Sequence, residues 1–101
     1  MTQYEFEAIK SELESIAEAI VKAKRPEYTQ DSQDVLANFR RVAADTGITP
    51  LQAWLVYFGK HYASICRSVA DPKAPSCEGI ESRFADIRNY LDLGFALFRE
   101  R

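Results

Sequence analysis

The chain has 101 residues and a formal net charge of −2, a length that fits one domain. This weakly acidic balance argues against long nucleic acid as a partner, because such binders are usually strongly basic. The sequence opens without a basic stretch before an apolar run, and no apolar run approaches about 18 residues. We therefore expect a cytoplasmic protein that makes no membrane contact.

The first expected helix covers residues 2–24. Thr2 and Glu5 have the spacing of a capping box, and Pro26 is expected to stop the helix. Its apolar residues recur at helical spacing and form one stripe, made of Ile9, Leu13, Ile16 and Ile20. Tyr28 follows in a linker, where its ring packs on the bundle end or stacks on a ligand.

The second expected helix covers residues 32–46. Asp31 or Ser32 would cap its start, and Gly47 is suited to the left-handed conformation that ends helices. Asn38 lies in its middle, where an asparagine indicates a polar partner. The expected buried positions are Val35, Leu36, Phe39, Val42 and Ala43.

The third expected helix covers residues 49–69 and has the clearest start in the chain. Thr49 caps it, Pro50 occupies the first turn, and Gln52 stands at the capping-box position. The side predicted to be buried consists of Leu51, Trp54, Leu55, Phe58, Tyr62, Ile65 and Val69.

The fourth expected helix covers residues 77–99, after a proline-rich loop. Gly94 within it indicates close approach of another helix or of a second subunit. Its predicted core face consists of Ile80, Phe84, Ile87, Leu91, Phe95 and Phe98. A second face carries a polar strip, made of Glu81, Arg83, Asp86, Asn89 and Tyr90.

These patterns predict an all-α fold. Four amphipathic helices joined by short loops favour an up-down four-helix bundle in a single domain, with the earlier helices around the last one. The high aromatic content leaves aromatic surface, so we also expect a homo-oligomer. The spacing of Cys66 and Cys77 matches no metal motif. We expect free thiols in a reducing compartment, with a disulfide between them as the alternative.

The polar strip of the last helix is the leading candidate for a ligand site. Residues three or four apart on a helix share a side, so Arg83, Asp86 and Tyr90 can act together. Lys60 and Arg67 supply further donors suited to phosphate, with His61 beside them. The alternatives are an Arg83–Asp86 pair on a solvated face and a partly buried histidine without a functional role.

Acidic residues of the first helix offer a second chemistry. Glu14 and Glu18 lie one turn apart and could hold Mg²⁺ together with Glu81 and Asp86. The alternative is an acidic, solvated helix face that keeps a small domain soluble.

Several runs of the chain resemble small phage and prophage proteins, the nucleotide-modification-associated helical domains. These runs are residues 24–29 (KRPEYT), 34–39 (DVLANF), 47–57 (GITPLQAWLVY), 60–65 (KHYASI) and 78–91 (EGIESRFADIRNYL). The chain is more distantly similar to the MazG- and dUTPase-type all-α nucleotide pyrophosphohydrolases. The resemblance implies a helical protein that works on or with nucleotides in the host cytoplasm. In those hydrolases each of two helices supplies a pair of acids for Mg²⁺. Asp86 matches the last acid, but Arg83 stands where its partner acid belongs.

An arginine in place of an acid favours phosphate binding over metal binding, so three hypotheses are ordered as follows. The first is an accessory protein that binds a nucleotide-derived molecule without a cofactor, as a regulator of nucleotide metabolism or as a sponge for a nucleotide signal of host defence. Its contacts would come from cations for phosphate (Lys24, Lys60, Arg83), amides for polar edges (Asn38, Asn89) and rings for stacking (Tyr28, Tyr90). The second is a Mg²⁺-dependent nucleoside triphosphate pyrophosphohydrolase. The third is a protein-interaction module that inhibits a host protein.

Overall fold

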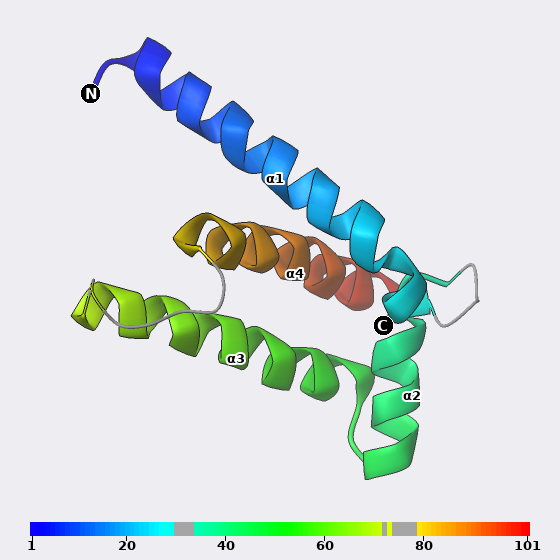
Figure 1. The fold of residues 1–101 in the computed structure, drawn as a ribbon. Helices are drawn as coiled ribbons and strands as arrows, with labels where there is room; N and C mark the ends of the chain where they lie inside the picture. Colours follow the sequence, from blue (N-terminus) through cyan, green and yellow to red (C-terminus); the bar gives the residue numbers. More distant parts are fainter. Residues whose placement is uncertain (30–33, 72, 74–78) are drawn as a thin grey trace.

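Figure 1 shows the computed structural model, which describes residues 1–29, 34–71, 73 and 79–101, with the backbone alone for residues 25–29. Within these ranges the chain is entirely helical, without strands. The helices are α1 (Gln3–Thr29), α2 (Ala37–Thr46), α3 (Pro50–Ala70) and α4 (Ile80–Glu100). The all-α prediction is therefore confirmed, and the arrangement is compatible with a helical bundle. No helix among the described residues has the length and apolar character that a membrane span requires.

The helix starts predicted from local sequence are confirmed where the structure describes them. The Thr49 hydroxyl accepts from the Gln52 backbone N–H at 3.1 Å, and the Gln52 side chain accepts from the Thr49 N–H at 2.9 Å. The same reciprocal pair joins Thr2 and Glu5 at the start of α1. Gly47 ends α2 with φ 76, in the left-handed conformation expected of it.

Two predicted helix boundaries differ from the structure. The stop at Pro26 was wrong, since α1 continues to Thr29. A proline removes one backbone donor, and a single missing bond in the last turn does not end a helix. α2 begins at Ala37 rather than at residue 32, and the predicted caps Asp31 and Ser32 lie outside the described residues. Asp34 directs this start instead, since its carboxylate accepts from the Leu36 N–H at 2.9 Å.

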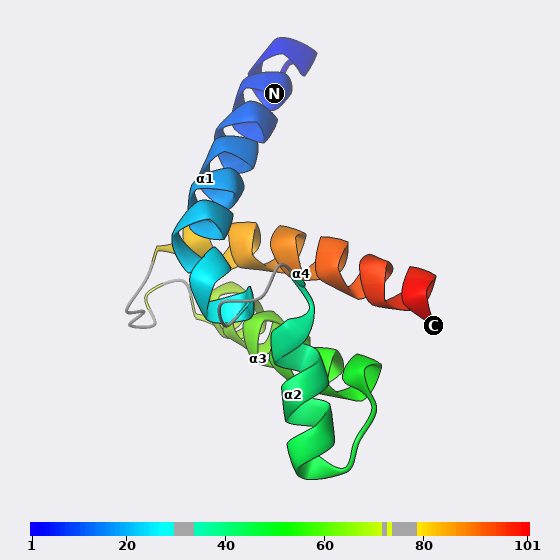
Figure 2. The same ribbon diagram turned by 90° about the vertical axis from the view of Figure 1, so that its right-hand side faces the viewer.

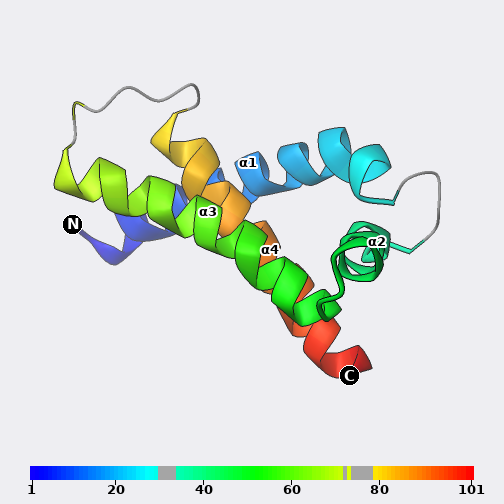
Figure 3. The ribbon, with the colours of Figure 1, turned by 90° about the horizontal axis from the view of Figure 1, so that it is seen from below.

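The helices α3 and α4 form an antiparallel pair, and the other two helices pack on it. α1 crosses α4, and α2 lies crosswise at the start of α3 (Figures 1 and 3). The first half of α1 projects from the rest of the molecule (Figure 2), and residues 1–12 are all exposed. The radius of gyration is 15.2 Å, whereas a compact domain of this length has about 13 Å.

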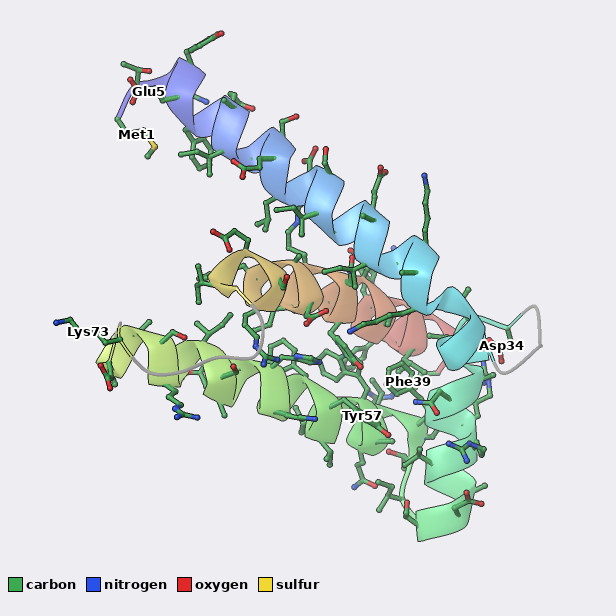
Figure 4. The ribbon with its side chains drawn as sticks, viewed as in Figure 1. Met1, Glu5, Asp34, Phe39, Tyr57 and Lys73 are labelled. Atoms are coloured by element: carbon green, nitrogen blue, oxygen red, sulfur yellow. The ribbon has the colours of Figure 1, made fainter. Side chains whose placement is uncertain are left out.

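The core lies where α2, α3 and α4 meet. Phe39 is 1% exposed, and its ring meets the rings of Tyr57 and Tyr90 edge-on at 6.0 and 6.1 Å. Figure 4 labels Phe39 and Tyr57 at this junction. The Trp54 indole donates to the Tyr90 carbonyl at 2.6 Å. A Cβ on Gly94 would lie 2.5 Å from the Trp54 ring, which confirms the close approach predicted at this glycine.

The predicted core face of α4 was wrong. Ile87 is half-buried, but the other five residues of that face are 41–57% exposed, namely Ile80, Phe84, Leu91, Phe95 and Phe98. The buried side has mostly small or polar residues, and its buried members are Ala85, Asp86, Tyr90, Gly94 and Leu97. Small side chains allow α1 and α3 to approach α4 closely, and these helices also supply partners for the polar groups. The prediction that the earlier helices lie around α4 therefore holds for one side of α4 only.

The same correction applies to parts of the other helices. Residues predicted to be buried but exposed in the structure are Ile9 of α1, Val35 before α2, and Leu55, Tyr62 and Val69 of α3. Ala17 and Ala53, which were not predicted, are buried at the helix contacts, and the predicted burial of Leu36, Phe39 and Ala43 is confirmed.

Candidate functional site: a buried carboxylate among cations

Asp86 is the most deeply buried charged residue described in the structure, at 2% exposure. The Lys24 ammonium of α1 lies 3.8 Å from its Oδ1, and His61 Nδ1 of α3 lies 3.7 Å from its Oδ2. Both distances are too long for hydrogen bonds. Three helices thus bring one carboxylate and two basic groups together.

His61 lies between the carboxylate and the aromatic core. Its side chain is 12% exposed, and its ring centroid is 4.7 Å from that of Tyr90. Burial lowers the pKa of His61, and the nearby charges of Lys24, Arg83 and Lys60 lower it further, while Asp86 opposes them. His61 is therefore mainly neutral at pH 7, with one ring nitrogen able to donate and the other able to accept.

Two buried nitrogens at this site have no hydrogen-bond partner within the part of the chain that the structure describes. They are His61 Nδ1 and Arg83 Nε. An unsatisfied buried polar group costs about 1–3 kcal/mol, so a water or a ligand atom that bonded to either nitrogen would stabilise the site. Lys24, Lys60 and Arg83 carry three positive charges against the single negative charge of Asp86. This surplus favours an anionic ligand.

The structure brings together most of the residues predicted on the last helix and its neighbours. They are Lys24 from α1, Lys60 and His61 from α3, and Arg83, Asp86 and Tyr90 from α4. The predicted Arg83–Asp86 pair on a solvated face is wrong, because Asp86 is buried and lies against Lys24 and His61. The predicted partial burial of His61 is confirmed, whereas its lack of a functional role stays a prediction.

Four other predicted ligand residues take different positions. The Asn89 amide donates to the Ala17 carbonyl at 3.0 Å and so holds α1 against α4. Asn38 lies on α2, where it accepts from Arg41 at 3.3 Å. Arg67 is exposed, two turns beyond Lys60. The side chain of Tyr28 lies outside the described residues.

The acids named for a magnesium site do not come together. Glu14 pairs with Arg88 at 3.5 Å across the exposed edge of the α1–α4 contact, and Glu18 and Glu81 are exposed. Among the described residues, no group of three or more His, Cys, Asp or Glu side chains could hold a metal ion. Cys66 is a free, exposed thiol, and Cys77 lies outside the described residues.

Sequence reasoning missed a charged network at the other end of the α3–α4 pair. Arg40 binds Asp34 at 2.7 Å and also binds Glu100, so it joins the start of α2 to the end of α4. The hydrogen bond from Arg40 holds the pKa of Asp34 below its usual value. A cavity of about 450 Å³ opens beside it, lined by Arg40, Thr49, Pro50, Leu51, Leu97, Glu100 and Arg101. Helical spacing gives no signal for a contact between residues so far apart in sequence.

No family model, curated protein or solved structure matches the chain. The resemblance to nucleotide-associated helical proteins therefore stays a prediction, and the geometry of the site has to support any function on its own.

Proposed function

We propose that this protein binds a nucleotide or a nucleotide-derived molecule between α1, α3 and α4. The observation that supports this most is a pair of buried nitrogens, on His61 and Arg83, that find no partner among the described residues, in a site with surplus positive charge. A phosphate oxygen is a strong acceptor and suits both nitrogens and the two lysines.

The carboxylate adds a second requirement for the ligand. Asp86 accepts hydrogen bonds and would repel a phosphate placed directly against it, so it suits a hydroxyl or amino donor of the same molecule. A nucleotide carries an anion and such donors a few ångströms apart. The His61 and Tyr90 rings offer an aromatic surface beside them.

Binding without turnover fits a regulator of nucleotide metabolism or a sponge for a nucleotide signal, and a phage origin would suit the second role. The magnesium-dependent hydrolase gains no support from the described acids, which do not form a metal-binding group. Release of pyrophosphate that requires Mg²⁺ and disappears in Asp86→Asn would establish that alternative.

Isothermal titration calorimetry tests the proposal with inorganic phosphate, pyrophosphate, linear nucleotides and cyclic dinucleotides. At least one nucleotide should bind more tightly than about 1 mM, and Arg83→Ala should weaken it at least about tenfold. Arg88→Ala is the matched control, since Arg88 is on the same helix but pairs with Glu14 at its edge. Circular dichroism confirms that each variant is helical.

Two results would refute the binding site. One is the absence of binding tighter than about 1 mM across the panel. The other is equal binding by wild type, Arg83→Ala and Arg88→Ala, which would place the ligand elsewhere.

A further inference from the structure

Exposed apolar side chains form stripes along two neighbouring helices, α3 and α4. On each helix, the residues of the stripe are three, four or seven positions apart and so share one side of the helix. We call the two sets together the apolar face: Leu55, Tyr62 and Val69 of α3, and Phe84, Leu91, Phe95 and Phe98 of α4. They are 45–76% exposed. Single exposed apolar residues are ordinary, whereas two stripes on neighbouring helices indicate an interaction site.

Both stripes lie on the same side of the α3–α4 pair. At the contact between the helices, Trp54 packs against Gly94. From there the Phe58 ring stacks on Trp54 at 5.1 Å, and the Tyr62 ring continues outward from Phe58 at 6.4 Å. On α4, Phe95 follows Gly94, and the helix turns by about 100° per residue, so the Phe95 side chain points away from the contact with α3. Along each helix, the exposed stripe is thus reached from the contact by turning in the direction in which the chain winds. Because the two helices are antiparallel, turning in this direction leads to the same side of the pair on both.

The other two helices cover the opposite side of the pair. α1 is fixed there by the bond from Asn89 to Ala17, and α2 by the contact of Phe39 with Tyr57. Figure 2 shows α1 rising and α2 descending from the pair, with the side on the right of the view uncovered. Among the described residues, the apolar face is therefore left without a neighbouring helix.

The surface area indicates how much is left uncovered. The chain of 11.5 kDa exposes 7249 Å². A compact monomer of this mass exposes about 5,800 Å², so the excess is about 1,400 Å². In obligate homodimers each partner buries about 1,000 Å² or more. The excess matches what one such interface removes from water, with the projecting part of α1 contributing to it.

We propose that a second copy of the chain covers the apolar face. Two α3–α4 pairs would meet around a two-fold axis and complete a four-helix bundle between subunits. The seven residues of the face carry no charge, so the face can meet itself without opposing like charges. Its phenylalanines and tyrosine are the residue types that dominate the buried centre of interfaces.

This arrangement leaves the candidate ligand site accessible. Lys24 belongs to α1 on the opposite side of the pair, and Asp86 points to that side. Dimerisation and ligand binding can therefore be tested separately, and neither proposal depends on the other.

Sedimentation equilibrium tests the dimer. At tens of micromolar the wild type should have twice the 11.5 kDa chain mass. Phe95→Ala and Tyr62→Ala should each raise the monomer–dimer dissociation constant at least about tenfold, as central aromatic residues of interfaces do. Val56→Ala is the control, because Val56 is 68% exposed on α3 but turned away from the apolar face. It should leave the dissociation constant unchanged.

A fourth variant covers the case in which truncation alone is too mild. Phe95→Glu puts a charge at a position that is 57% exposed in the single chain, so it should give a helical monomer. A wild-type mass of 11.5 kDa at about 100 µM would overturn the proposal. A dimer that tolerates Phe95→Glu and Tyr62→Ala as well as Val56→Ala would also overturn it, because its interface would lie elsewhere.

Discussion

Asp86 is held in the interior by charge and not by hydrogen bonds to its nearest bases. A carboxylate in such a place costs several kcal/mol unless cations compensate it. Lys24 and His61 approach from two different helices, at 3.8 and 3.7 Å. Since only Lys24 is charged when His61 is neutral, the charge balance around Asp86 depends on pH.

The pH dependence of stability should identify the state of His61. Burial lowers the pKa of His61 in the folded chain below the usual 6.5, which applies to the unfolded chain. At a pH between the folded and unfolded pKa, the unfolded chain therefore binds a proton that the folded chain does not. The free energy of unfolding should therefore be level above about pH 6.5 and fall below it, by at most about 1.4 kcal/mol per pH unit. Urea unfolding at half-unit steps from pH 7.5 to 5.5 measures the slope.

His61→Gln is the natural control, because the chain has a single histidine. The variant should lose this slope, while the contribution of Asp34, whose pKa is lowered, is lost only at more acidic pH. An unchanged slope in His61→Gln would assign the proton to another group.

At the scale of the helix, α4 presents two faces that could each be buried. The inner one has small and polar residues and packs at short range on α1 and α3. The outer one has phenylalanines that would hold neighbouring helices farther away. Gly94 decides the contact with α3, because it lets the Trp54 ring lie against the backbone of α4.

Gly94→Ala should destabilise the protein, although alanine favours a helix. The added Cβ would lie 2.5 Å from the Trp54 ring, and overpacking of this kind costs about 1–3 kcal/mol. Gly59→Ala is the matched control, since a Cβ on Gly59 of α3 meets nothing within 4 Å. It should stabilise the protein by about 0.5–1 kcal/mol through helix propensity. Chemical denaturation measures both, and equal effects would mean that Trp54 repacks freely.

At the scale of the whole molecule, the single chain buries little. Among the described residues, the well-buried members of the cluster around Phe39 are Leu36, Phe39, Tyr90 and Leu97. The radius of gyration exceeds that of a compact domain by about 2 Å. A chain of this kind should depend on association for part of its stability.

The thermal midpoint should therefore rise with protein concentration. Circular dichroism melts at about 5, 50 and 500 µM should shift upward in sequence, because the second copy binds the folded chain and not the unfolded one. Phe95→Glu should melt at one temperature across this range, below the wild type. A wild-type midpoint independent of concentration would show that the single chain carries its full stability.

Local chemistry in the sequence determined the helices and several of their ends. Thr2, Thr49 and Gly47 act within one turn of their own position, so their roles could be predicted and are confirmed. The start of α2 could not be placed in the same way, because it depends on the Asp34 turn and on its pairing with Arg40.

The sequence also indicated most members of the site. Arg83, Asp86 and Tyr90 share a helix face at short spacing, and Lys60 and His61 are polar residues in the middle of a mainly apolar helix. That Lys24 reaches the same carboxylate was decided by the crossing of α1 over α4.

Only the tertiary structure decided which face of α4 points inward. Periodicity shows that a helix has an apolar side, and it contains no information about whether the same chain or another one covers it. Here close packing on Ala85 and Gly94, with cations available for Asp86, turned Asp86 and Tyr90 of the polar strip inward. The phenylalanine stripe was left for the surface, where we propose that a second copy meets it.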